Sequence, residues 1–163
     1  MKLKMIVCVK RINDKLLIGD KNPEGNGLLW HSKEELQFFK EKTIGNVVVF
    51  GENTAKHVPI KLIEKTREVE ILTLDVNFDD ILEKYKDTEK DIFICGGATI
   101  YKYILDNYQL DEIYVSELDN KVDVKESKNP LYFPSLENYG YKIVRGKKYN
   151  DFLSYVYVGQ DKR

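Results

Sequence analysis

Short apolar runs alternate with amphipathic stretches along this chain, which is the pattern that strands alternating with helices produce. The apolar runs predict buried strands at residues 3–9, 47–50, 68–74, 92–95 and 112–118. A continuous β-branched run such as Val47 to Phe50 is typical of a strand buried on both faces of a parallel sheet. Amphipathic spacing predicts helices at 32–43, at 78–85 and after Gly97, and a short helix follows Gly51.

Two further strands, 141–148 and 152–158, are joined by Tyr149-Asn150-Asp151, which predicts an antiparallel hairpin. The glycine-rich stretch 19–29 predicts a loop, and the polar segment 119–138 predicts a long connection. The whole pattern predicts an α/β fold in one domain over residues 1–163. We expect a mostly parallel sheet with an antiparallel C-terminal hairpin and helices on both faces. Ligands of such sheets bind at the carboxyl ends of the strands.

Composition narrows the classes of function. The chain has 163 residues, and its 26 Lys and Arg against 27 Asp and Glu give a formal net charge of −1. That balance argues against nucleic-acid binding through bulk positive charge. Two cysteines and two histidines give no metal-binding spacing, and the apolar runs are too short for a membrane span or a secretory signal. We therefore expect a cytoplasmic protein with no metal, no nucleic-acid partner and no membrane segment.

Two glycine turns lead from a buried strand into a helix. Gly96-Gly97 follows one strand, and Gly51 follows another, with Asn53 or Thr54 as the expected helix cap. Helix N-termini favour anions, and two of them in one parallel sheet suit a dinucleotide. Simple tight turns that bind nothing are the alternative. Glu52 fits the phosphate interpretation poorly, because a carboxylate repels a phosphate.

The segment from Trp30 to Phe39 predicts a helix with a carboxylate beside its apolar side. Ser32 and Glu35 have the spacing of a capping box, and Leu36 and Phe39 are expected near the core. A carboxylate near an apolar face has a raised pKa and can hold an amidine-like ligand edge. The alternative is a solvated helix face in a charged segment. Further along the chain, Arg67 precedes a strand and can bind a carboxylate with both of its terminal nitrogens.

Taken in order, these motifs resemble the dihydrofolate reductase family over nearly the whole chain, from Met5 to the C-terminal strands. The matching elements are Trp30, Glu35, Phe38-Phe39, Thr43, the V-V-F-G-x-x-T of 48–54, Arg67, the C-G-G-A-T-I-Y of 95–101, the I-Y-V-S of 113–116 and the L-Y-F-P of 131–134. The resemblance implies reduction of 7,8-dihydrofolate to tetrahydrofolate by hydride transfer from a reduced nicotinamide cofactor, NADPH in most members. It also implies a monomer with an eight-stranded, mostly parallel sheet.

The resemblance also implies roles for individual residues. Glu35 and Trp30 would be catalytic: the acid would hold the pyrimidine edge of the pterin and support its protonation, and Trp30 would help to place a water. Residues implied to bind substrate are Val7, Glu35, Phe39, Val58, Arg67, Cys95, Tyr101 and Ser116. Residues implied to bind the cofactor are Cys8, Ile18, Gly19, Gly51, Asn53, Thr54, Thr73, Gly96, Gly97, Ala98, Thr99 and Ile100. A cis peptide often joins the two glycines in this family.

The chain departs from the family where the 2′-phosphate of NADPH would lie. Glu52 replaces the usual Arg, Asp75 adds a second acid, and Thr99 stands where a basic residue is common. An acid near the ribose suits a free 2′-hydroxyl. We therefore predict a weakened preference for NADPH, with NADH as a usable cofactor. The competing interpretation is that Lys56 supplies the missing charge.

The loop before Trp30 also departs from the family, because residues 22–27 lengthen it and Leu29 replaces the usual proline. Altered loop closure, and hence altered product release, is the expected effect. Two rival functions remain open from the sequence. One is a related pteridine or pyrimidine reductase of the same fold, and the other is a nucleotide-binding homologue without catalytic activity.

Overall fold

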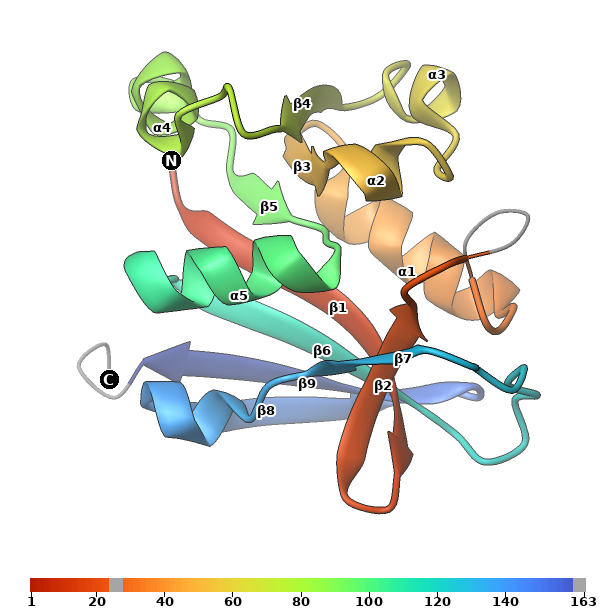
Figure 1. Ribbon diagram of the computed structural model, residues 1–163. Helices are drawn as coiled ribbons and strands as arrows, with labels where there is room; N and C mark the ends of the chain where they lie inside the picture. Colours follow the sequence, from red (N-terminus) through yellow and green to blue (C-terminus); the bar gives the residue numbers. More distant parts are fainter. Residues whose placement is uncertain (24–27, 160–163) are drawn as a thin grey trace.

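The computed structural model describes residues 1–23 and 28–159, and within them the chain forms a nine-stranded sheet flanked by helices (Figure 1). The strands are β1 (Leu3–Ile12), β2 (Lys15–Asp20), β3 (Val47–Gly51), β4 (Glu68–Leu72), β5 (Ile92–Ile94), β6 (Glu112–Leu118), β7 (Pro130–Phe133), β8 (Tyr141–Lys148) and β9 (Phe152–Gly159). The helices are α1 (Lys33–Thr43), α2 (Glu52–Ala55), α3 (Ile60–Ile63), α4 (Phe78–Tyr85), α5 (Ala98–Asn107) and a 3-10 turn, η1 (Leu136–Tyr139).

The sheet has a parallel half and an antiparallel half. Its order is β4-β3-β5-β1-β6-β9-β8. Neighbours from β4 to β6 run parallel, whereas β9 is antiparallel to β6 and β8 is antiparallel to β9. The carboxyl ends of the parallel strands therefore lie together, as the alternation of strands and helices predicted. The mixed α/β fold class and the C-terminal hairpin are confirmed.

The described sheet has nine strands where eight were expected: seven form its main path, and two short strands, β2 and β7, pair with each other beside it. The outer part of β1 forms a hairpin with β2 through Asn13 and Asp14, whose φ angles are 50° and 65°. Asparagine and aspartate tolerate this left-handed conformation, so the turn is local chemistry that the apolar pattern did not reveal. Likewise, β7 lies inside the predicted long connection 119–138, and η1 begins inside it.

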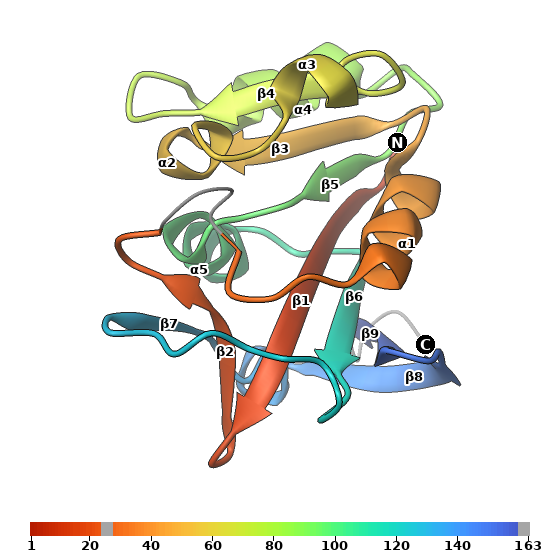
Figure 2. The ribbon, with the colours of Figure 1, turned by 90° about the vertical axis from the view of Figure 1, so that its right-hand side faces the viewer.

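Helices α1 and α5 lie on opposite sides of β1 (Figure 2), and a hydrophobic cluster lies on each face of the sheet. Side chains of α4 and α5 pack on one face with Met5 and Val7, and Phe38 of α1 packs on the other with Ile6. The alternation of Met5, Ile6 and Val7 between these clusters follows from the two-residue period of a strand. Within the described part of the chain, no helix is long and apolar enough to cross a membrane.

Some local predictions need correction. Leu36 is 44% exposed, because the sheet-facing side of α1 is centred on Phe38 and Phe39 rather than on Leu36. The cap of α2 is Gly51, with no side-chain hydrogen bond, instead of Asn53 or Thr54. The fourth strand ends at Leu72. Of the loop predicted at 19–29, residues 19 and 20 belong to β2, and residues 24–27 lie outside the described residues.

Candidate functional site

The first turn of α1 carries Glu35 to the sheet. The helix begins after Ser32, whose hydroxyl oxygen accepts a hydrogen bond from the backbone N–H of Glu35 at 3.1 Å. This is the predicted cap, and it fixes the backbone of the acid. Opposite the helix, Cys8 of β1 and Ser116 of β6 are register partners near the carboxyl ends of their strands. The capping signal in the sequence thus placed Glu35 correctly at the start of a helix.

Glu35 lies in a partly buried environment with other titratable groups beside it. Burial raises the pKa of Glu35 to about 7, and a hydrogen bond from the neighbouring Cys8 thiol opposes part of that rise. Burial and the adjacent Glu35 raise the pKa of Cys8 in turn, against a smaller opposing effect of Trp30. Tyr101 of α5 is close enough for Cys95, Cys8 and Glu35 to add to the burial that raises its own pKa. A carboxyl group that titrates near neutrality is suited to general acid–base chemistry.

Tyr101 joins α5 to β1 at this point. Its hydroxyl donates a hydrogen bond to the backbone carbonyl of Ile6 at 2.8 Å, and the ring packs edge-on against Phe133 of β7. Tyr101 thus connects α5 to the backbone of β1 and to β7 on one face of the sheet.

Arg67 is a buried cation at the start of β4, 9% exposed. Its Nη1 donates to the Thr43 hydroxyl at 3.1 Å, and its guanidinium carbon lies 5.8 Å from the centre of the Phe39 ring. Burial lowers its pKa, and among residues 1–23 and 28–159 its polar partners are hydroxyls and no carboxylate. A buried guanidinium without a protein carboxylate can bind the carboxylate of a ligand. Phe39 and the nearby Val58 are half-buried apolar residues at the same core.

The two glycine turns touch one another. The backbone N–H of Gly51 donates to the carbonyl of Gly96 at 2.7 Å. A Cβ added at Gly97 would lie 2.8 Å from the Thr54 hydroxyl oxygen, and one at Gly51 would lie 2.6 Å from Cγ1 of Ile100. Gly96 has a φ of 118°, and the peptide bond between Gly96 and Gly97 is cis, as the resemblance implied.

The N-terminus of α5 follows directly. Its cap, Gly97, provides no side-chain hydrogen bond, so the first-turn N–H groups of Ala98, Thr99 and Ile100 receive no cap from that residue. Such a helix start favours an anion. The glycine cradle and the helix start therefore fit the pyrophosphate of a dinucleotide.

Other predicted residues lie on β1, β2 and β6 and directly after β4. Ile18 and Gly19 are in β2, Thr73 follows β4, and Ser116 is 1% exposed on β6. The side chain of Val7 belongs to the cluster on the α5 face, so the alternation of β1 turns it away from the face that carries Cys8. Cys8, which is predicted to bind the cofactor, lies beside Glu35.

The acids that distinguish this chain from the family pattern are on the surface. Glu52 is exposed as the first residue of α2, and Asp75 is exposed in the turn after β4. Lys56, at the end of α2, is exposed as well. Leu74, next to Asp75 in the chain, is fully exposed as well.

Sequence reasoning missed two long-range contacts, one of them at the start of α1. Asp151, in the turn between β8 and β9, accepts a hydrogen bond from the Ser32 hydroxyl at 2.6 Å. Asp20, at the end of β2, accepts hydrogen bonds from Ser127 and from the backbone of Asn129. Both join segments more than a hundred residues apart in the chain, and no local pattern signals such a pairing.

A hollow of about 710 Å³ lies next to the contact between Ser32 and Asp151. It is lined by residues 28–31, residues 121–125 and Asp151. Trp30 borders it, but Glu35, Arg67 and the glycine turns do not. Apart from Trp30, the residues predicted to bind substrate and cofactor therefore do not line this hollow.

Comparison with known proteins places this chain in a family. The family model described as dihydrofolate reductase matches residues 5–157. The dihydrofolate reductase of Mycoplasma genitalium is 29% identical over 133 residues, covering 72% of this chain and 78% of that protein. The dihydrofolate reductase of Lactococcus lactis is 27% identical over 161 residues, covering 90% of this chain and 88% of that protein.

A solved structure has the same fold. Dihydrofolate reductase from Enterococcus faecalis, complexed with NADP(H) and RAB-propyl, superimposes with a TM-score of 0.70. The match covers 98% of this chain and 97% of that one at 22% sequence identity.

Proposed function

Because this chain belongs to the dihydrofolate reductase family, we propose that it reduces 7,8-dihydrofolate to tetrahydrofolate with a reduced nicotinamide cofactor. The observation that carries the proposal is Glu35, a partly buried carboxyl with a pKa of about 7 at the carboxyl edge of a parallel sheet. A ring nitrogen that must gain a proton as hydride reaches the adjacent carbon needs such a group.

Substrate would bind between α1 and the sheet. Glu35 would hold the amidine-like edge of the pterin, with Ser116 and Cys95 around the ring and Trp30 helping to place a water near the acid. Val7 and Tyr101 would support this pocket from the α5 face of the sheet. Phe39 and Val58 would contact the benzoyl ring, because both are half-buried apolar residues packed against the same cluster and Phe39 lies beside Arg67. Arg67 would bind a carboxylate of the glutamate tail, which suits a buried guanidinium whose described partners are hydroxyls.

The cofactor would lie across the two glycine turns, and its reduced nicotinamide would supply the hydride. Gly96 and Gly97 would let it approach the backbone, and the first turn of α5 would bind its pyrophosphate through Ala98, Thr99 and Ile100. The other residues proposed to contact the cofactor are Cys8, Ile18, Gly19, Gly51, Asn53, Thr54 and Thr73.

The proposal extends to cofactor choice. Glu52 and Asp75 are exposed acids beside the α2 turn and the end of β4, where a 2′-phosphate would meet unfavourable charge. NADH is therefore expected to serve with an efficiency within 100-fold of NADPH, measured as kcat/KM. Replacing Glu52 with Arg is expected to raise the NADPH/NADH ratio.

Cofactor oxidation followed at 340 nm tests both parts. Dihydrofolate-dependent oxidation by the purified protein supports the reductase, and its absence from folded protein contradicts it. A preference for NADPH of 100-fold or more contradicts the second part. In that case Lys56→Ala shows whether Lys56 supplies the charge, because its loss would then weaken NADPH use and leave NADH use unchanged.

A further inference from the structure

Asp151 makes three hydrogen bonds to three different parts of the molecule. Its carboxylate accepts from the Ser32 hydroxyl at 2.6 Å, and its backbone N–H donates to the Glu34 carboxylate at 2.8 Å. Its backbone carbonyl accepts from the N–H of Asp119 at 2.8 Å. The turn between β8 and β9 is thereby fastened to the start of α1 and to the end of β6.

The start of α1 is the part of that helix that carries the acid. Glu35 is the third helical residue, and first turns fray because their N–H groups have no partner within the helix. Ser32 supplies the missing acceptor for the Glu35 N–H, and Ser32 itself is buried, with 4% of its surface exposed. That hydroxyl accepts in a fixed direction when its own O–H points elsewhere, and the Asp151 carboxylate accepts a hydrogen bond from that O–H.

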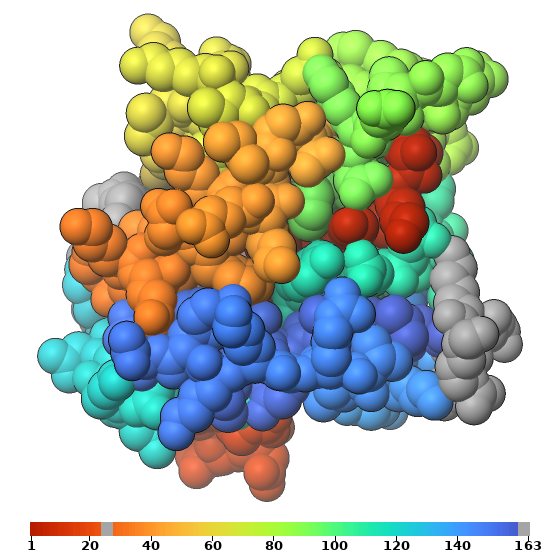
Figure 3. Space-filling model, turned by 180° about the vertical axis from the view of Figure 1, so that it is seen from behind, coloured from red at the N-terminus to blue at the C-terminus, as the bar shows by residue number. Residues whose placement is uncertain are grey.

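Packing brings the two segments into direct contact. The rings of Phe38 and Tyr149 meet edge to face at 5.6 Å, and Phe38 meets Phe152 in the same way at 5.3 Å. From behind, the orange surface of α1 rests on the blue surface of the C-terminal hairpin (Figure 3). The hairpin turn is therefore held rigidly enough to orient the helix start.

We propose that Asp151 is a positioning residue for Glu35: it holds the Ser32 cap, and through that cap it fixes the acid against the sheet. The chain of contacts runs from the Asp151 carboxylate to the Ser32 hydroxyl and from there to the backbone of Glu35. A second link, from the Asp151 N–H to Glu34, fixes the preceding residue of the same turn. The proposal rests on the function proposed above where it concerns turnover, but the geometry of Glu35 can be measured without turnover.

Two measurements test the proposal on Asp151→Ala. The first follows the side-chain carboxyl of Glu35 by ¹³C NMR as a function of pH. Loosening the first turn exposes Glu35 to water, so its pKa is expected to fall by about one unit toward that of an exposed glutamate. The second measures dihydrofolate turnover at pH 7, which is expected to fall about tenfold because the acid is displaced. The groups that face Glu35, namely Cys8 and Tyr101, are unchanged in this variant.

Matched variants separate positioning from general stability. Asp151→Asn keeps an oxygen that accepts from Ser32 and is expected to restore most of the wild-type pKa and turnover. Asn150→Ala alters the exposed neighbour in the same turn and is expected to change neither. Ser32→Gly removes the hydroxyl at small cost to the cap and is expected to reproduce the effect of Asp151→Ala. It decides the question if Asp151→Ala does not fold.

The outcomes are distinct. An unchanged Glu35 pKa in Asp151→Ala or Ser32→Gly overturns the positioning role, whatever the enzyme does. A wild-type protein without dihydrofolate turnover overturns the proposed function and leaves the NMR result to decide the positioning role.

Discussion

The carboxyl group of Glu35 is largely removed from water, which disfavours its charged form and makes both stability and turnover depend on pH. Its folded-state pKa of about 7 lies above the ordinary value of 4.5, so the folded protein binds an extra proton between these pH values. Stability contributed by the neutral carboxyl is therefore complete below about pH 4.5 and is lost as the pH rises toward 7. Turnover that needs the protonated acid should also decline above about pH 7.

The variant Glu35→Gln tests both consequences. It keeps the shape of the side chain but cannot ionise, so turnover at neutral pH should fall by at least about 10²-fold. Its free energy of unfolding at pH 8 should exceed that of the wild type by about 1–3 kcal/mol, and the difference should vanish near pH 4. Urea denaturation at the two pH values measures this, and near-normal turnover in the folded variant would move the catalytic role elsewhere.

Arg67 offers a second test at the residue scale. In Arg67→Lys the charge remains, but the planar fork that reaches Thr43 and stacks near Phe39 is lost. The KM for dihydrofolate is expected to rise about tenfold with little change in kcat. A dihydropterin without the glutamate tail serves as the control substrate, because its KM should be the same for both proteins. An equal rise for both substrates would argue against a carboxylate-binding role.

At the scale of elements, the close approach of two turns depends on residues without side chains. A Cβ at Gly51 would lie 2.6 Å from Ile100, which must then move. Gly51→Ala is expected to lower the free energy of unfolding by about 1–3 kcal/mol. Gly19→Ala is the matched control, since no atom lies within 4 Å of its added Cβ, and it should change stability by less than about 0.5 kcal/mol. Thermal unfolding of the two variants compares them, and equal stability would contradict the contact.

Elements whose signal is local were predictable from the sequence. The apolar run of β3 and the Ser32 cap of α1 are each recognisable from a few consecutive residues, and both are confirmed. The pairing of β2 with β7 and the contact of Ser32 with Asp151 depend on segments that only the fold brings together. The prediction that Leu36 lies near the core was wrong for a related reason. The side of α1 that faces the sheet is set by the contact of Phe38 with Phe152 of β9.

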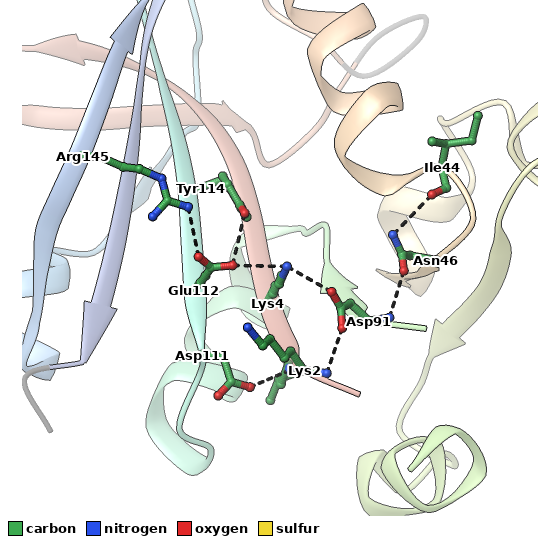
Figure 4. A network of polar contacts seen from close by, with 10 residues as sticks. Lys2, Lys4, Ile44, Asn46, Asp91, Asp111, Glu112, Tyr114 and Arg145 are labelled. Carbon is green, nitrogen blue, oxygen red and sulfur yellow. Dashed lines mark hydrogen bonds and ion pairs between the residues drawn. The ribbon is translucent and has the colours of Figure 1, made fainter. Parts of the chain in front are cut away.

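At the scale of the whole molecule, a charged network ties the sheet together at the end opposite the candidate site (Figure 4). Lys4 of β1 contacts Asp91 at 3.0 Å and Glu112 at 3.2 Å, and Arg145 of β8 reaches Glu112 at 3.1 Å. Burial acts to lower the pKa of Lys4, but its acidic partners outweigh this and raise it. Burial acts to raise the pKa of Glu112, but Lys4 and Arg145 hold it below its usual value.

Lys4→Met should therefore leave two acids without their shared cation. The expected loss is about 1–3 kcal/mol of unfolding free energy near pH 7, since the Lys4 side chain is only 13% exposed. The loss should shrink as the pH falls through the lowered pKa of Glu112, below the ordinary glutamate value, and as it rises through the raised pKa of Lys4, above the ordinary lysine value. Lys102→Ala, which removes an exposed pair with Asp106 on α5, should cost less than about 0.5 kcal/mol. Comparable losses in the two variants would contradict a special role for the network.

The position of β9 has a consequence for biosynthesis. This strand lies between β6 and β8, inside the sheet, although it is the last strand to be synthesised among those described. While the ribosome still holds residues 152–159, β6 has an open edge that can pair with another nascent chain. The start of α1, which carries Glu35, also lacks its contact with Asp151 until then, because Asp151 is synthesised with the same hairpin. A chain stalled before this hairpin would carry every proposed ligand-binding residue and still lack a fixed Glu35.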